Sequence, residues 1–284
     1  MTKIAIVTDS TAYISKDFVK KHKIRVIPLS VHWDDNTYLD GVDITPAQFY
    51  ERLEKSSTIP STSQPSAGDF LQAFKELAPH CDGIIVPLIS SGISGTVASA
   101  KTAASMFSEV PVEVIDSHVT AAGLALVVTA IAKEASYGKN LKEIKQLAEG
   151  IVKKLKIFFV VDTLKYLHKN GRIGGASRYL GAALSIKPIL YLDDQGKIDA
   201  LEKVRTKRKA IERLIQLAVE QAGGKPVKVG VMHANALKEA KNLQEQLLEQ
   251  LDCAQIGIYD ISPVIGIHVG PGTVGLAIYA VDGK

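Results

Sequence analysis

Short apolar runs alternate with amphipathic helical patterns from the start of the chain. Lys3–Thr8 (KIAIVT) is short, rich in β-branched residues and followed by Asp9, which is typical of a buried parallel strand. Three further strands are expected at Arg25–Trp33, Gly83–Ile89 and Val112–Ile115. Pro28 lacks a backbone N–H and therefore indicates an edge or a bend in the first of these three.

Capping residues and helical periodicity place helices between these strands. Ser15, Thr45 with Pro46, and Ser66 each precede an amphipathic segment in the way that helix N-caps do. Further helices are predicted in 96–107 (TVASAKTAASMF), in the apolar stretch 121–132 and in the charged stretch 141–156. Regular alternation of strands and helices predicts an α/β layer built on a parallel sheet.

The pattern changes beyond about residue 156. A strand is expected over Ile157–Leu164, a helix of small residues over 176–185, and two strands around a turn at Asp194-Gln195-Gly196. The remaining expected elements are helices at Lys207–Ala222 and Leu237–Leu251 and strands at Val227–Met232, Gln255–Ile261 and Val274–Val281. The hairpin implies a mixed sheet. We therefore predict two α/β domains, residues 1–156 with a parallel sheet and residues 157–284 with a mixed sheet.

Composition narrows the class of protein. The 284 residues are 46% hydrophobic and 23% charged, which excludes a disordered, collagenous or coiled-coil chain. A net charge of +4 carries no nucleic-acid signature. Cys81 and Cys253 form no CxxC pair, so a disulfide framework or cysteine zinc site is not expected, and a reducing cytosol fits. With Asp9 interrupting any signal peptide and no long apolar span, we expect a cytoplasmic protein without a transmembrane segment.

The clearest candidate for a ligand site is SSGISGT, Ser90 to Thr96. It follows a predicted strand and opens a predicted helix, where glycines allow close approach and backbone N–H groups favour an anion. Ser94 and Thr96 add hydroxyl donors. The segment matches neither a P-loop nor a G-x-S-x-G nucleophile elbow. An ordinary glycine-rich turn with a serine cap is the alternative interpretation.

Two further segments carry hydroxyl or imidazole groups. STSQPS, Ser61 to Ser66, precedes a helix, although turn and capping roles are the more common explanation for such a segment by itself. GIHVGPGTVG, Gly266 to Gly275, is expected to form a tight turn or bulge before the last strand, with His268 accessible among glycines. A set of serines, threonines and one histidine, without HExxH or an Asp-rich metal loop, indicates carboxylate binding and no metal or other cofactor.

Basic residues concentrate in KVRTKRK, Lys203 to Lys209, and Arg172 stands in the turn GRIGG. Such a run is usually a solvated helix start, but positive charge there opposes the helix dipole, so an acidic partner is the alternative interpretation. Nucleic acid is disfavoured because no aromatic residues are interleaved with the run.

The chain resembles DegV proteins along its whole length. The resemblance is carried by VTDST at 7–11, STSQPS at 61–66, SSGISGT at 90–96, VIDS at 114–117, NGRIGG at 170–175 and HVGPGTVG at 268–275. It implies two α/β domains with a long-chain fatty acid bound in the cleft between them. It further implies that the protein presents the carboxylate to a separate fatty acid kinase catalytic subunit, which forms an acyl phosphate for phospholipid synthesis.

Residue roles also follow from this resemblance. Thr62 and Ser94 would hydrogen-bond the carboxylate, with His268 beside it and Ser63, Gly95 and Thr96 as further candidates. Arg172 and Arg205 correspond to residues that dock the kinase, and both are expected at the surface near the mouth of the cleft. The expected protein is a non-enzymatic lipid-binding subunit.

Two other functions remain open on the sequence. A serine hydrolase would use Ser94 as nucleophile and His268 as base, and would require an orienting group such as Asp9 or Asp116. A sensor of a small anionic metabolite would use the same cleft for a shorter ligand.

Overall fold

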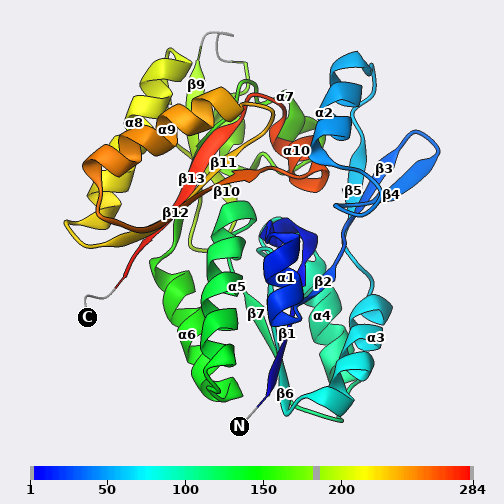
Figure 1. The fold of residues 1–284 in the computed structure, drawn as a ribbon. Helices are drawn as coiled ribbons and strands as arrows, with labels where there is room; N and C mark the ends of the chain where they lie inside the picture. The colour runs from blue at the N-terminus through cyan, green and yellow to red at the C-terminus, as the bar shows by residue number, and fades with distance from the viewer. Residues whose placement is uncertain (1–2, 182–185, 282–284) are drawn as a thin grey trace.

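The computed structural model describes residues 3–181 and 186–281, and two large sheets organise them (Figure 1). The first sheet has the order β2-β1-β6-β7 with every pair parallel. Its strands are β1 Ile4–Asp9, β2 Arg25–Ile27, β6 Gly83–Leu88 and β7 Val112–Asp116. The predicted parallel sheet is therefore confirmed.

The second sheet has the order β10-β9-β8-β13-β11-β12. Its strands are β8 Lys156–Val160, β9 Lys187–Leu192, β10 Ile198–Val204, β11 Val227–His233, β12 Cys253–Asp260 and β13 Val274–Ala280. β11 and β12 pair in parallel and the other neighbours pair antiparallel, so the predicted mixed sheet is confirmed. The hairpin of β9 and β10 around residues 193–197 is also as predicted.

Among the described residues, six helices form three layers around the two large sheets. The layer outside the first sheet consists of α3 Ala67–Leu77 and α4 Thr96–Ser105, and the layer between the sheets consists of α5 Ala121–Ser136 and α6 Leu141–Lys154. The layer outside the second sheet consists of α8 Lys207–Ala222 and α9 Leu237–Gln250. Figure 1 shows α8 and α9 on the outer side of the second sheet. Because α5 contacts both sheets, every residue from Ala121 to Val128 is buried, and the sequence there is correspondingly apolar on all sides.

A smaller antiparallel sheet and a helix extend from the side of the first large sheet towards the second large sheet. The sheet has the order β4-β3-β5, with β3 Ser30–Trp33, β4 Asn36–Leu39 and β5 Ser61–Ser63, and α2 Pro46–Lys55 packs beside it. Trp33 and Phe49 form its core with ring centroids 5.5 Å apart. The predicted single strand Arg25–Trp33 is therefore wrong, because the chain bends at Pro28 and the two halves join different sheets.

Several other boundaries differ from the sequence expectation. The strand expected over Ile157–Leu164 ends at Val160, and the chain then turns into the short helix α7 Lys165–Lys169. The helix expected over 176–185 is a 3-10 helix, Gly174–Tyr179, and residues 182–185 lie outside the described residues. The first helix, α1 Lys16–His22, begins after Ser15 as predicted, because the Ser15 hydroxyl accepts from Phe18 N.

None of the helices in the described part of the chain is long and apolar enough to cross a bilayer. Across 3–181 and 186–281, no group of three or more His, Cys, Asp or Glu side chains is arranged to hold a metal ion.

Candidate functional site

A cavity with mainly apolar walls lies where both large sheets, α5, the small sheet and α10 (Pro263–Val269) meet. It encloses about 790 Å³ of space free of atoms, counting its opening to solvent. The apolar lining consists of Leu29, Ile89, Ile93, Ala121, Ile157, Phe159, Leu192, Ile198, Met232, Ile261, Val264, Ile265 and Val269. The lining is that of a pocket for a largely hydrophobic ligand with a small polar part.

The polar part of the lining includes a pair that joins distant segments. Thr62 on β5 and His268 on α10 lie with Oγ1 and Nε2 2.9 Å apart. Val31 on β3 pairs with Thr62 in the small sheet, which fixes where the hydroxyl stands. Burial, helped by the charge of Arg172, lowers the pKa of His268 to about 4. The imidazole is therefore neutral near pH 7 and, in the tautomer protonated on Nε2, donates to an oxygen.

The loop 90–96 brings one hydroxyl, that of Ser94, to the cavity, whereas the other candidates in this loop, Gly95 and Thr96, are absent from the lining. Ser94 Oγ lies 2.8 Å from Thr96 Oγ1, and Ser94 lines the cavity beside Ile93. Gly95, the N-cap of α4, makes no side-chain cap, and a Cβ there would lie 2.9 Å from Gln64 Nε2. The two hydroxyl-rich segments predicted from sequence thus lie close together, with the Gln64 side chain next to Gly95.

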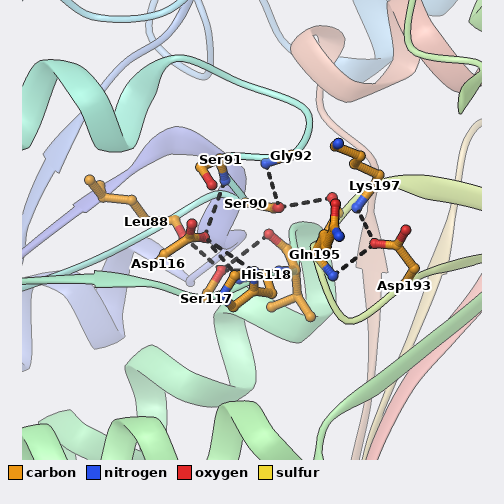
Figure 2. A network of polar contacts seen from close by, with 12 residues as sticks. Leu88, Ser90, Ser91, Gly92, Asp116, Ser117, His118, Asp193, Gln195 and Lys197 are labelled. Atoms are coloured by element: carbon orange, nitrogen blue, oxygen red, sulfur yellow. Dashed lines mark hydrogen bonds and ion pairs between the residues drawn. The ribbon is translucent and has the colours of Figure 1, made fainter.

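A hairpin turn of the second sheet closes over the same loop (Figure 2). Ser90 Oγ donates to Gly196 O at 2.8 Å and accepts from Gly92 N at 3.0 Å. Gly196 has φ +69°, and a Cβ there would overlap Ser90 Oγ. Asp193 Oδ1 accepts from the backbone N–H groups of residues 195 and 197, which holds the turn in shape. The loop that presents Ser94 is therefore fixed from both halves of the chain.

The other predicted residues are placed as follows. Ser63 lines the cavity, and its Oγ lies 2.8 Å from His32 Nε2. Arg172 is exposed, lines the opening and donates from Nε to Ile93 O at 3.3 Å. Arg205, also exposed, follows β10 and is absent from the lining. The structure therefore brings Arg172 to the polar group and leaves Arg205 apart from it.

The arrangement expected of a serine hydrolase is not formed by the described residues. Ser94 Oγ bonds Thr96 rather than His268, and His268 Nδ1 has no hydrogen-bond partner within 3–181 and 186–281. The two carboxylates considered as orienting groups serve the backbone instead. Asp9 accepts from Ile89 N at 2.7 Å, and Asp116 accepts from Ser91 N and His118 N, each at 3.1 Å.

The setting of His268 differs from the sequence expectation. It stands in the last turn of the helix α10, whereas a glycine-framed turn was predicted. This helix is almost wholly buried, which stabilises it. It packs so closely that a Cβ at Gly266 would lie 2.5 Å from the Tyr50 hydroxyl, so only glycine fits at this position. The expected turn follows directly after it, at Gly270 and Gly272, both with positive φ.

Sequence reasoning missed other polar residues of the cavity, namely Gln64, Thr120 and Thr273. The Thr273 hydroxyl donates to Val269 O at 3.0 Å and to Gly270 O at 2.9 Å, so it holds the end of α10. The glycines around Thr273 are a sequence signal from which its role could have been predicted. The signal for Thr120 is weaker, because it is a single threonine before an apolar helix.

Comparison with known proteins finds relatives over the whole length of the chain. The family model for uncharacterised proteins of the DegV family matches residues 3–281. A DegV domain-containing protein of Halalkalibacterium halodurans is 39% identical over 98% of this chain and 99% of its own length. The Bacillus subtilis protein DegV is 36% identical over 96% of this chain and 98% of its own length.

Among the similar solved structures is a DegV family protein from Thermus thermophilus, which is reported for its fatty acid binding. It has a TM-score of 0.93 and 31% sequence identity, and the match covers 99% of this chain and 100% of that one. Bacillus subtilis DegV, described as a fatty acid binding protein, has a TM-score of 0.90, 34% identity, and coverage of 99% and 100%. The sequence match and the shared fold over nearly the whole chain place this protein in the DegV family.

Proposed function

We propose that this protein binds a long-chain fatty acid in the cavity and presents its carboxylate to a separate kinase, which forms the acyl phosphate. The observation that carries the proposal is a cavity with mainly apolar walls whose few polar side chains include Ser94 and the contacting pair Thr62 and His268. Relatives in Thermus thermophilus and Bacillus subtilis that share the fold over 99% of this chain are described as fatty acid binding.

Burial of the hydrocarbon supplies most of the affinity. A sixteen-carbon acid has about 14 methylenes, which at ~0.8 kcal/mol each contribute on the order of 11 kcal/mol. Immobilising the chain takes back several kcal/mol. The head group then needs only neutral donors, which leave the carboxylate nucleophilic, whereas a bidentate arginine would hold it more tightly.

The head-group assignment is tested by removing single hydroxyls. Thr62→Val and Ser94→Ala each delete one donor to a carboxylate, which costs roughly 1.5–3 kcal/mol, or about ten- to hundredfold in Kd. Thr102→Ala is the matched control, because that hydroxyl bonds Ala98 O on the exposed side of α4. Unchanged palmitate affinity in both site variants would contradict the assignment.

The identity of the ligand separates the candidate functions. Mass spectrometry of material extracted from the purified protein should show a long-chain fatty acid. A short polar anion would instead support the metabolite sensor. Esterase activity in the isolated protein, lost in His268→Ala, would support the hydrolase.

The partner is tested with a purified fatty acid kinase catalytic subunit. Arg205→Ala should leave palmitate affinity unchanged and lower acyl phosphate formation, because an exposed arginine steers an acidic partner. Arg172→Ala should lower both, since this residue lies at the opening. Lys241→Ala, an exposed cation on the outer helix α9, is the control. Equal kinase affinity for wild type and Arg205→Ala would reject the docking role.

A further inference from the structure

Thr120 is a polar residue of the cavity wall that the head-group site does not use. It stands directly before α5, is 9% exposed, and has extended backbone with φ −153° and ψ −178°. The next residue, Ala121, has φ +54°, a left-handed conformation that is unfavourable for a residue with a Cβ. The chain therefore makes a strained corner where Thr120 meets the cavity.

The hydroxyl of Thr120 is buried and unsatisfied. Its Oγ1 has no hydrogen-bond partner in the described part of the chain. Threonine at the N-cap of a helix ordinarily accepts from the N2 or N3 backbone N–H, but Thr120 makes no such bond to α5. A buried hydroxyl without a partner has a free-energy cost, which a partner supplied by a ligand removes.

Most of the residues that line the cavity together with Thr120 are apolar. Ile157 and Ala121 share the cavity wall with Thr120. Thr62 and His268, by contrast, bond each other. Thr120 thus contributes a buried hydroxyl without a hydrogen-bond partner among the described residues to a wall that is mainly apolar.

We infer that Thr120 is a specificity-determining residue that favours acyl chains carrying a hydrogen-bond acceptor along the hydrocarbon, either the π electrons of a cis double bond or a chain oxygen. This inference rests on the proposed function, because it requires a fatty acid in the cavity. A saturated chain offers only C–H groups and leaves the hydroxyl unsatisfied. A double bond accepts a weak hydrogen bond, and an oxygen accepts an ordinary one.

The test compares Kd values for stearate, positional isomers of cis-octadecenoate and mid-chain hydroxystearates. Wild type should bind one positional isomer roughly two- to fivefold more tightly than its neighbours, as expected for a weak hydrogen bond. Thr120→Val has nearly the same shape and lacks the donor. It should lose that preference and bind stearate at least as tightly as wild type. Thr129→Val on the same helix, whose hydroxyl bonds Ala125 O, is the control.

The outcomes are distinct. A positional preference that persists in Thr120→Val would mean that the shape of the cavity selects the chain, and would overturn the role of the hydroxyl. Equal affinities for every acid in both proteins would overturn it as well. Failure of wild type to bind any of these acids would instead reject the proposed function.

Discussion

His268 and Asp40 lie at opposite ends of α10, and burial moves their pKa values in opposite directions. Asp40 is 2% exposed and accepts from Ser262 Oγ at 2.9 Å and from Val264 N at 3.4 Å, so it holds the start of the helix. Burial raises the pKa of Asp40 to about 6, against the lowering effect of these hydrogen bonds. At the other end, burial lowers the pKa of His268 to about 4.

The two groups should give opposing contributions to stability in mild acid. Between about pH 6.5 and 4 the unfolded chain protonates His268 and the folded protein does not, so acidification reduces the free energy of unfolding. Between about pH 6 and 3.8 the folded protein protonates Asp40 and the unfolded chain does not, so acidification increases it. A shift of two pKa units corresponds to about 3 kcal/mol, so the two contributions largely offset.

Single substitutions should expose each contribution. From pH 7 to pH 4.5, Asp40→Asn should lose more stability than wild type, and His268→Gln should lose less. Urea denaturation at several pH values measures both. Asp35→Asn, which removes an exposed carboxyl, is the control. The same pH dependence in all four proteins would show that neither group titrates as described.

Residue types alone indicated the candidates for head-group binding, but not which hydrogen bonds the polar residues around them form or lack. Thr62 and Ser94 stand in hydroxyl- and glycine-rich segments beside helix starts, a pattern visible in one dimension. The unsatisfied state of Thr120 is not visible there, because it depends on the absence of a partner among side chains brought together by folding. Asp40 was missed for the same reason, since its donors are more than 200 residues away.

At the scale of elements, capping and periodicity predicted α1, α2, α3 and α8 closely, because their signals are local. α10 was missed because PVIGIHV contains a glycine and β-branched residues, which are poor helix formers. Its helix is stabilised by burial against Phe49 and Tyr50 and by Asp40. The strands β3 and β5 were obscured by Pro28 and by the serine-rich sequence, and tertiary pairing decides them.

The β9–β10 turn yields a prediction at this scale. Gly196→Ala combines an unfavourable positive φ with overlap against Ser90 Oγ. Gly223→Ala has the same kind of φ, +55°, but nothing within 4 Å of the new Cβ. The second change should cost about 1 kcal/mol, and the first clearly more. Denaturant unfolding measures both, and equal costs would contradict a tight contact between the turn and Ser90.

At the scale of the molecule, the two sheets share one helical layer. The largest apolar cluster contains residues from both sides of residue 156, including Ile6, Leu124, Ile157 and Ala277. We propose residues 1–156 and 157–284 as the two domains, since this boundary lies at the start of β8 (Lys156–Val160), the first strand of the second sheet. The shared layer implies that these domains depend on each other for folding.

A fragment comprising residues 1–156 should therefore not fold on its own. It would expose the face of α5 that packs on β11 and β13, and the lost burial exceeds the few kcal/mol by which domains are stable. Thermal unfolding followed by circular dichroism should show no cooperative transition in the fragment and one in the full chain. A cooperative transition in the fragment would contradict this.

The enclosure of α5 between two sheets also constrains how its sequence can diverge. α6 has polar side chains along its exposed side, so replacements there cost little. In α5 a gain of volume must be matched by a loss in a facing strand: a Cβ at Gly230 on β11 would lie 2.7 Å from Ala122 Cβ. A substitution that adds volume at such a position is therefore expected to require a compensating change in the residue that faces it.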